Sequence, residues 1–200
     1  RYVLVVEGRT EFDAIPAAAR RLNELNPTEY KTLEALGVAV IDAQTDAQVA
    51  PLGKFFSDLG KTVFAVFDKQ EPAASATIKA AVHHSFESAE KGFENVVLRH
   101  TAEAALRRYA LSLVAENTWP NHLIAKAPNE THTLEQIRDA LRQFFSWAKG
   151  SGDAGDLLGC CTEAEIPQYV RDTLRAIHVT VEPPPLPQLP PVFAPFEDEL

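Results

Sequence analysis

Three short apolar runs that contain no alternating polar residues constrain the fold of this chain most strongly. They are Val3–Val6, Val38–Ile41 and Val63–Phe67, and each is rich in β-branched or aromatic residues. Uninterrupted apolar runs of this length are typical of strands buried on both faces of a parallel sheet. Helical segments are predicted between the runs, which gives the strand–helix order of a doubly wound unit. We therefore predict an α/β fold with a mostly parallel sheet and helices on both of its faces.

The helices of the first half follow from apolar spacing. Residues 10–25 place apolar side chains on one face, but Pro16 is acceptable only in a first turn. We therefore expect the regular helix to begin near Asp13. A second helix is predicted over residues 47–59, and it ends at Gly60, a residue type that commonly terminates helices.

The second half of the chain is predicted to be helical. An apolar stripe indicates a helix over residues 101–117. Two capping boxes, in which a Thr and an acidic or amide residue three positions later satisfy each other's backbone, open the later helices: Thr133 with Gln136, and Thr162 with Glu165. The first of these helices is expected to end at Lys149-Gly150 and the second to continue through Ile177. Residues 151–155 are predicted to form a short loop between them.

Length and composition fit one compact domain with a modest subdomain. The 200 residues are 46% hydrophobic and 24% charged, which is ordinary globular composition. We expect a catalytic core over residues 1–100, a helical subdomain over residues 101–178 and a proline-rich tail over residues 179–200. Because the chain has no methionine and begins directly with a strand, we expect it to be a piece of a longer polypeptide whose amino-terminal part is missing.

The lengths of the apolar runs, the cysteines and the net charge argue against several classes of protein. No apolar run is long enough to span a membrane, and no signal peptide precedes the first strand, so we expect no membrane partner. Cys160 and Cys161 are adjacent and cannot form an ordinary disulfide, which favours a reduced pair in a cytoplasmic protein. The net charge of −9 argues against binding nucleic acid through bulk positive charge, although bound metal ions would reverse the local field.

Acidic residues stand at the ends of all three predicted strands. Glu7 follows the first strand, Asp42 ends the second and Asp68 follows the third. Glu11 comes four residues after Glu7, just past the turn Gly8-Arg9-Thr10, so its side chain can point back to the same crevice. Ligands of open α/β sheets gather at these strand ends. Carboxylates buried together repel one another unless a cation neutralises them, and hard oxygen ligands favour Mg²⁺, Mn²⁺ or Ca²⁺. Glu11 as a favourable helix-start acid and Asp42 as a turn residue are the structural alternatives.

Other polar residues are less constrained by their positions. Glu71 and Glu94 have no fixed place in the predicted sheet, and Glu87 and Glu90 are assigned to a solvated face. The pair His83-His84 has no partner at metal-ligand spacing, so we interpret it as structural or exposed.

The opening segment Val3–Glu11, with its Glu-Gly-x-Thr-Glu pattern, resembles the first motif of Toprim domains in the OLD (overcoming lysogenization defect) family of ATP-dependent nucleases. In Toprim proteins an Asp-x-Asp motif follows two strands later. Asp68 matches its first Asp, whereas Gln70 stands at the position of the second. Either Glu71 or Glu94 therefore completes the metal site, or the second metal position is weakened.

Two further segments extend the resemblance over residues 2–177. The segment Lys91–Leu98 is similar to a family segment that supplies another acidic ligand, which points to Glu94. The family's carboxy-terminal stretch, which carries an active-site lysine, is similar to Ala148–Gly150, Leu157–Leu158 and Glu165–Pro167 taken in order. The resemblance thus assigns the lysine to Lys149.

The resemblance implies a Toprim-like fold and hydrolysis of DNA phosphodiester bonds with two divalent ions, Mg²⁺ or Mn²⁺, with Ca²⁺ as a non-catalytic substitute. The implied ligands are Glu7, Glu11, Asp68 and Glu94, with Asp42 or Glu71 as additional ligands. Glu7 is also placed to accept a proton from the attacking water. Lys149 would donate to the phosphate as negative charge builds on it.

The sequence contains no Gly-x4-Gly-Lys-Ser/Thr phosphate-binding loop. The resemblance therefore assigns ATP, and the formation of a homo-oligomer, to an ABC-type ATPase in the missing amino-terminal part. Two alternatives stay open. One is another Toprim activity of the primase, topoisomerase or ribonuclease type. The other is a non-catalytic module for DNA docking or dimerisation within a larger ATPase.

Overall fold

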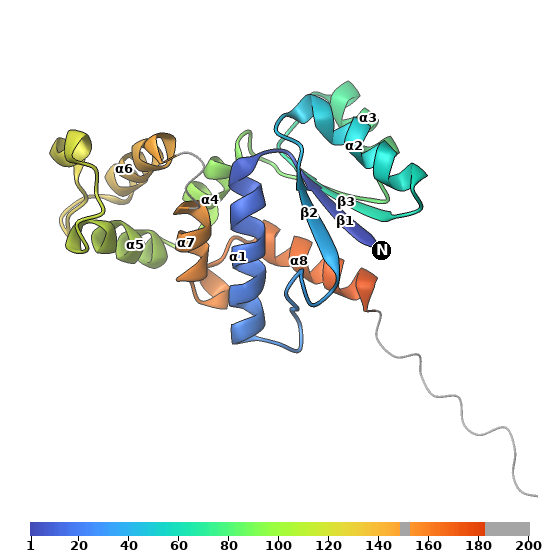
Figure 1. The fold of residues 1–200 in the computed structure, drawn as a ribbon. Helices are drawn as coiled ribbons and strands as arrows, with labels where there is room; N and C mark the ends of the chain where they lie inside the picture. The colour runs from blue at the N-terminus through green and yellow to red at the C-terminus, as the bar shows by residue number, and fades with distance from the viewer. Residues whose placement is uncertain (149–152, 183–200) are drawn as a thin grey trace, which may run out of the picture.

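The computed structural model describes residues 1–148 and 153–182 (Figure 1). Its centre is a parallel sheet with the strand order β2-β1-β3-β4. The strands are β1 (Tyr2–Val6), β2 (Val38–Asp42), β3 (Thr62–Phe67) and β4 (His84–Glu87). Val6 lies beside both Asp42 and Val66, so the first three strands end at the same level. The predicted α/β fold with a parallel sheet is confirmed.

Helices cover both faces of the sheet, as the apolar runs predicted. Side chains of β1 alternate between two cores, with Val3 and Val5 in one and Leu4 and Val6 in the other. The first core lies under α2 (Asp46–Asp58) and α3 (Pro72–Ala81), and the second under α1 (Arg9–Leu25) and α8 (Gln168–Val181) (Figure 1). The two inner strands, β1 and β3, are therefore buried from both sides.

The remaining helices extend to one side of the sheet and then return to it. The extension contains α4 (Phe93–His100), α5 (Glu103–Ala115), the 3-10 helix η1 (Asn121–Lys126) and α6 (Leu134–Trp147) (Figure 1). The short helix α7 (Asp153–Gly159) then packs against α1, and one apolar core runs from the sheet through all of these elements. None of the described helices has the length and apolarity needed to cross a membrane.

Helix α1 differs from the prediction at its start. It begins at Arg9 rather than near Asp13, and Pro16 lies inside it. A proline in a helix interior removes one hydrogen bond and destabilises the helix by about 3 kcal/mol. The buried face of α1, which includes Ala14, Ile15 and Ala18, packs on the sheet and on α7, and this burial offsets the local penalty.

The two capping boxes have different outcomes. The box of Thr133 caps α6 as predicted. The box of Thr162 is also formed, but it opens the 3-10 helix η2 (Glu163–Glu165) rather than a long helix. Pro167 is the reason, because it holds Ile166 in an extended conformation and α8 begins only after it.

Two predicted boundaries are wrong, because α7 begins within the predicted loop and α8 extends beyond its predicted end. Residues 153–155, predicted as part of a loop, form the first turn of α7 and pack on α1. Helix α8 continues through Val181, so residues 179–181 are helical rather than the start of a tail. The predicted helix end at Lys149-Gly150 and the tail from residue 183 lie outside the described residues.

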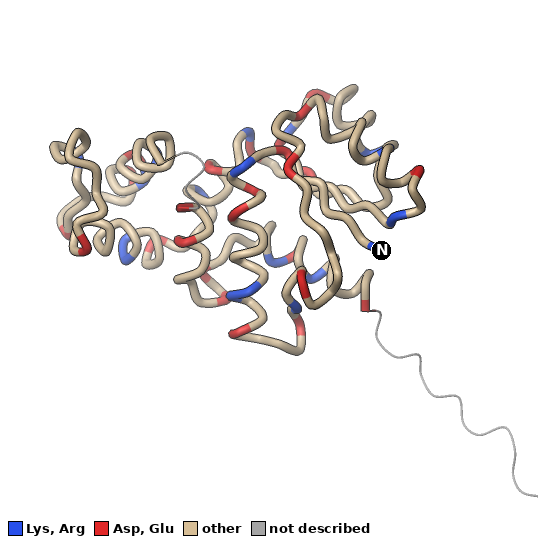
Figure 2. The backbone as a smooth tube through the Cα atoms, viewed as in Figure 1, with Lys and Arg blue, Asp and Glu red and all other residues tan. Residues whose placement is uncertain are grey.

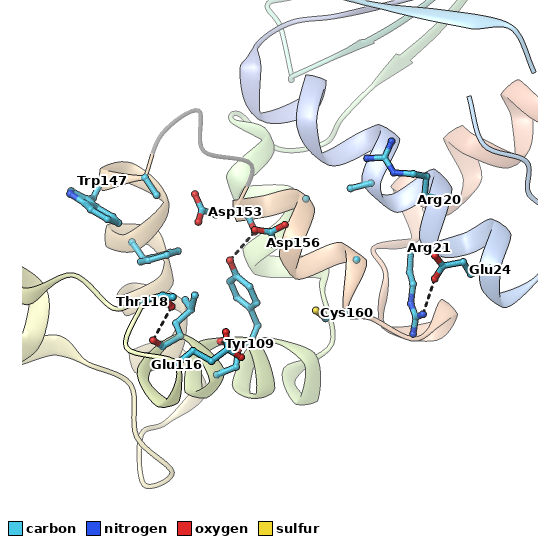
Figure 3. A pocket seen from close by; sticks show the side chains of 17 residues that line it. Arg20, Arg21, Glu24, Tyr109, Glu116, Thr118, Trp147, Asp153, Asp156 and Cys160 are labelled. Carbon is cyan, nitrogen blue, oxygen red and sulfur yellow. Dashed lines mark hydrogen bonds and ion pairs between the residues drawn. The ribbon is translucent and has the colours of Figure 1, made fainter. Parts of the chain in front are cut away.

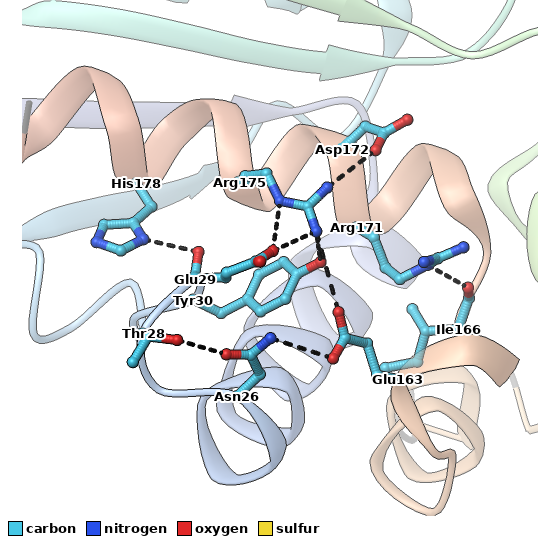
Figure 4. Close-up of polar contacts among 10 residues, drawn as sticks. All are labelled: Asn26, Thr28, Glu29, Tyr30, Glu163, Ile166, Arg171, Asp172, Arg175 and His178. Atoms are coloured by element: carbon cyan, nitrogen blue, oxygen red, sulfur yellow. Dashed lines mark hydrogen bonds and ion pairs between the residues drawn. The ribbon is translucent and has the colours of Figure 1, made fainter. Parts of the chain in front are cut away.

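A polar network fixes α8 to the connection between α1 and β2 (Figure 4). Arg175 donates from Nη2 to Glu29 Oε2 at 2.6 Å and to the hydroxyl of Tyr30 at 2.7 Å. Tyr30 is fully buried, and the guanidinium of Arg175 also lies over its ring. Asn26 donates to Glu163 at 3.4 Å, which joins η2 to the same connection. The network holds α8 in place over the sheet.

Candidate metal centre

A hollow of about 480 Å³ lies at the carboxyl ends of the first three strands, and we call it the acidic pocket. Figure 2 shows acidic positions grouped where α1 meets these strand ends. The carboxylates that line the pocket come from four loops or helix starts: Glu7, Glu11, Asp42, Asp68 and Glu94. The parallel sheet brings the first four together, because β1, β2 and β3 end at the same level. The first turn of α4 adds Glu94.

Each of four of these carboxylates accepts hydrogen bonds at one of its two oxygen atoms. The contacts are Asp68 N to Glu7 Oε2 at 2.9 Å, Gln44 N to Asp42 Oδ1 at 2.7 Å, Gly92 N to Asp68 Oδ2 at 2.6 Å and Thr10 Oγ1 to Glu94 Oε1 at 2.6 Å. Within the described part of the chain, the second oxygen of each carboxylate accepts no hydrogen bond. The protein thus orients each group and leaves one oxygen available to a ligand.

Asp68 carries the clearest sign of a missing partner. Its side chain is only 9% exposed, and within residues 1–148 and 153–182 its Oδ1 is buried with no hydrogen-bond partner. A buried acceptor without a partner is unfavourable. Burial, and then the charge of Glu7, raise the pKa of Asp68 to about 6. A cation at Oδ1 would satisfy this atom and favour the charged carboxylate.

Glu11 is the most strongly perturbed acid of the pocket. It is 4% exposed, and burial raises its pKa to about 8, with the charges of Asp68, Glu7 and Glu94 acting in the same direction. Burial also raises the pKa of Glu7. Buried carboxyl groups whose pKa values are raised by desolvation and by one another's charge are typical of sites that bind a cation or transfer protons.

Two glycines allow the backbone to approach the carboxylates closely. A Cβ on Gly8 would lie 3.4 Å from Glu11 Oε2. Gly92 has a φ of 85°, a conformation that disfavours other residues, and its N–H donates to Asp68. A Cβ on Gly92 would lie 3.6 Å from Glu94 Oε2. Larger residues at both positions would crowd the oxygen atoms that face the pocket.

The donor set of the acidic pocket fits a hard divalent cation. Among the described residues that line it, the anionic ligand atoms are all carboxylate oxygens, and none of these residues is a His or Cys. Among the residues that the structure describes, no three acidic, His or Cys side chains converge closely enough to hold an ion as they stand. The strand ends fix where these side chains start, whereas Glu side chains rotate readily about their side-chain torsions.

The other predicted site residues are placed differently. Glu71 is exposed at the start of α3 and does not line the acidic pocket. Lys149 lies outside the described residues. Gln70, which replaces an expected acid, donates from Nε2 to Glu7 Oε2 at 3.1 Å. Sequence analysis identified the substitution at this position but not the contact with Glu7.

The assignment of Glu87 and Glu90 to a solvated face is wrong. Glu87 ends β4, is partly buried, and accepts hydrogen bonds from the backbone N–H of Gln70 at 3.1 Å and from Lys79 at 2.7 Å. The contact with Lys79 is the main reason that the pKa of Glu87 falls to about 2. Glu90 is also partly buried and pairs with Arg99 at 2.8 Å. Both acids hold the loops beside the pocket.

A larger hollow of about 720 Å³ lies among α1, α5, α6 and α7 (Figure 3). Both arginines that line it are already paired, Arg21 with Glu24 at 3.1 Å and Arg20 with Glu34 at 2.9 Å. Tyr109 donates to the backbone of Asp153, and burial raises the pKa of its hydroxyl. Tyr109 therefore belongs to the packed helical core, as its apolar stripe predicted.

Comparisons with known proteins agree with this geometry. Residues 1–69 match the family model of the TOPRIM domain of overcoming lysogenization defect protein-like proteins. The match ends just after Asp68 and so includes all of the first three strand ends. No curated protein matches the chain.

Solved structures extend the likeness beyond residue 69. The C-terminal region of the Burkholderia pseudomallei OLD protein is 18% identical with a TM-score of 0.59, over 90% of this chain and 98% of that one. The C-terminal region of the Xanthomonas campestris pv. campestris OLD protein is 18% identical with a TM-score of 0.63, over 90% and 94% of the two chains. Residues 1–69 thus match the TOPRIM domain of the OLD-like family, in a chain that has the fold of the C-terminal region of OLD proteins.

Proposed function

We propose that this chain is a divalent-metal-dependent DNA endonuclease domain that hydrolyses phosphodiester bonds. The observation that carries the proposal is the buried, unpartnered Oδ1 of Asp68 among carboxylates that gather at the strand ends of a TOPRIM domain. Nuclease activity is the typical chemistry of a TOPRIM module in OLD proteins, as the resemblance of the opening motif implies. Acidic residues around one hollow suit phosphoryl-transfer chemistry, in which positive charge must offset the charge of the phosphate.

The proposed cofactors are two Mg²⁺ or Mn²⁺ ions, with Ca²⁺ as a non-catalytic substitute. The residues that would hold them are Glu7, Glu11, Asp42, Asp68 and Glu94, whereas the exposed Glu71 is left out of the set. When bound, such ions acidify a water molecule and stabilise negative charge on the departing 3′ oxygen.

The chain's own residues have distinct parts in this proposal. Glu7 has one oxygen held by Asp68 N and Gln70, so its other oxygen is free to accept a proton from the attacking water. Thr10 holds Glu94 in place. Lys149 would donate to the phosphate as its negative charge increases.

We also propose the setting in which the domain works. The substrate is DNA, in the cytoplasm, and a separate ABC-type ATPase segment supplies ATP hydrolysis and assembles the protein as a homo-oligomer. The sequence of this chain has no phosphate-binding loop of its own. Both cysteines are free in the structure, with Cys160 exposed, which agrees with a reducing compartment.

Plasmid cleavage tests the proposal. The domain is incubated with supercoiled DNA and Mg²⁺, Mn²⁺, Ca²⁺ or EDTA, beside Asp68→Asn and a control variant, Asp58→Asn. Asp58 makes only a surface pair with Lys54, so the control has the same chemical change away from the pocket. We expect Mg²⁺ or Mn²⁺ to support nicking in the wild type and the control, and a loss of about 100-fold or more in Asp68→Asn.

The Asp68→Asn variant separates activity from stability. Because burial penalises the charged form of Asp68, its neutral replacement is expected to fold at least as well as the wild type in EDTA at neutral pH. Circular dichroism and urea unfolding check this. Wild-type levels of nicking in the folded variant would refute the assignment of Asp68 to the metal site.

A non-catalytic docking module is the second candidate function. The observation that favours it is Gln70, whose amide occupies an oxygen of Glu7, together with carboxylates that do not converge on one point in the described residues. A folded domain that binds Mn²⁺ and DNA but cuts in none of the metal conditions would support this function.

A further inference from the structure

A second hollow lies beside the acidic pocket, and two lysines line it. Its volume is about 570 Å³, and we call it the basic hollow; it is lined by Lys69, Lys79, Ser85, Glu87, Ser88 and Ala89. Asp68 lines the acidic pocket and the next residue, Lys69, lines the basic hollow. The loop after β3 therefore separates two hollows of opposite charge.

The loops after β3 and β4 hold each other in place around this boundary. Lys69 N donates to Glu90 O at 3.0 Å, and Gly92 N donates to Asp68 Oδ2 at 2.6 Å. Gln70 N donates to a side-chain oxygen of Glu87 at 3.1 Å. The backbone of Lys69 is thus fixed on both sides, and the residue has a defined position relative to the acidic pocket.

The basic hollow has a net positive charge although it contains one acid. Glu87 Oε2 accepts hydrogen bonds from Ser75 at 2.6 Å and from Lys79 at 2.7 Å, so its charge is compensated. Lys69 is exposed, and within residues 1–148 and 153–182 neither its ammonium nor the Ser85 hydroxyl makes a hydrogen bond. One lysine therefore remains uncompensated, in a chain whose net charge is −9.

Lys91 lies on the other side of the same boundary. It is exposed, and it directly precedes Gly92, whose N–H donates to Asp68 Oδ2 at 2.6 Å, so it stands beside the acidic pocket. In the part of the chain that the structure describes, Lys91 makes no ion pair. Lys69 and Lys91 thus provide available positive charge on either side of the loops that frame the pocket.

We propose that the basic hollow binds a backbone phosphate of the DNA strand whose neighbouring phosphodiester enters the acidic pocket. The inference rests on the proposed function. Lys69 is the main contact, the Ser85 hydroxyl is available as a second donor, and Lys91 attracts the strand toward the mouth of the pocket. A strand that approaches clustered carboxylates is repelled, and lysines beside the pocket offset this repulsion without contacting the reacting atoms. Lys69 is therefore a positioning residue.

Salt-dependent DNA binding tests the proposal. The affinity of the chain for a fluorescein-labelled duplex is measured by anisotropy in Ca²⁺ over a series of NaCl concentrations, for the wild type, Lys69→Ala, Lys91→Ala and Lys61→Ala. Lys61 immediately precedes β3, at the opposite end of that strand from Lys69, and is the matched control. Each phosphate contact contributes about 0.9 to the slope of log affinity against log salt concentration.

We expect Lys69→Ala to weaken binding about threefold to tenfold and to reduce the slope by about 0.9, with a smaller effect for Lys91→Ala. Lys69→Arg restores the slope, and Lys61→Ala leaves it unchanged. In plasmid cleavage, Lys69→Ala raises KM and leaves kcat near the wild-type value. An unchanged slope in Lys69→Ala, an equal loss in Lys61→Ala, or no salt-dependent binding by the wild type would overturn the proposal.

The outcomes of this test distinguish a failure of the phosphate-site proposal from a failure of the nuclease proposal. If the wild type fails to cut DNA but Lys69→Ala reduces the slope, the basic hollow is a phosphate site and the nuclease proposal fails. If the wild type cuts DNA and the slope is unchanged, the nuclease proposal stands and the basic hollow has no part in binding.

Discussion

Replacing Glu11 with Gln is expected to change how the stability of the metal-free protein depends on pH. Glu11 is buried, and its pKa is about 8 in the folded protein against an ordinary value of 4.5. Between these two values the folded state keeps a proton that the unfolded state has lost. The free energy of unfolding therefore falls as the pH rises from about 4.5 to about 8, and Gln at this position removes that contribution.

The magnitude follows from the two pKa values. Each tenfold change in proton affinity corresponds to about 1.4 kcal/mol, so a pKa of about 8 instead of 4.5 gives an upper bound of about 5 kcal/mol. Asp68 has a pKa of about 6 instead of 3.8, so it contributes up to about 3 kcal/mol to the free energy of unfolding at lower pH. This contribution is the same in the wild type and in Glu11→Gln. The wild type and Glu11→Gln should therefore be similar near pH 4.5 and differ most above pH 8.

Urea unfolding followed by circular dichroism, in EDTA and at intervals from pH 4.5 to pH 9, measures this difference. The control is Glu24→Gln, the same change on the exposed side of α1, where Glu24 pairs only with Arg21. The control should follow the wild-type profile. Adding Mn²⁺ at pH 8 should stabilise the wild type more than Glu11→Gln, because a bound cation favours the charged carboxylate.

Parallel pH profiles for the wild type and Glu11→Gln would refute this reasoning. The result would mean that water or a side-chain rotation solvates the carboxylate in the folded protein. A variant that is less stable than the wild type at every pH would instead assign Glu11 a structural role as a hydrogen-bonding acid.

Two further predictions concern the packing that holds the site. A Cβ on Gly155 would lie 3.1 Å from a backbone oxygen of α1, so Gly155→Ala should lower the free energy of unfolding by about 1–2 kcal/mol, whereas Gly159→Ala, which meets open space, should not lower it. Arg175→Ala should cost about 1–2 kcal/mol, because it leaves the hydroxyl of the buried Tyr30 without its donor. Arg20→Ala, at an exposed pair, should cost less than about 0.5 kcal/mol. Urea unfolding measures all four, and equal effects within either pair would contradict the prediction.

The centre of the fold and most of the acidic pocket could be predicted because their signals are local. The first three strands are continuous apolar runs, and each matches its predicted bounds to within a residue. Since parallel strands end at one edge, the acids that follow them had to meet there, as Glu7 and Asp68 do. The helix-start acid Glu11 belongs to the same pocket because it lies in the first turn of α1, which begins shortly after the end of β1.

The missed features depend on contacts between distant segments. Strand β4 has the sequence His-Ser-Phe-Glu, with one large apolar residue, because an edge strand is less buried than a central one. Because the apolar pattern does not predict β4, the sequence places Glu87 on a solvated face and does not indicate the basic hollow. No local pattern could show that the amide of Gln70 reaches Glu7, or that Pro16 is tolerated because α1 packs on α7.

The packing of α7 and α8 against α1 has a consequence for how the chain reaches its native state. α1 is synthesised well before α7 and α8, which are the last helices described. The apolar stripe of α1 therefore stays partly uncovered until α7 and α8 have been synthesised, and these distant contacts slow folding. Nascent chains that stop before α7 would leave the face of α1 around Ala17, which Gly155 of α7 approaches, uncovered, and would be prone to aggregate or to need a chaperone.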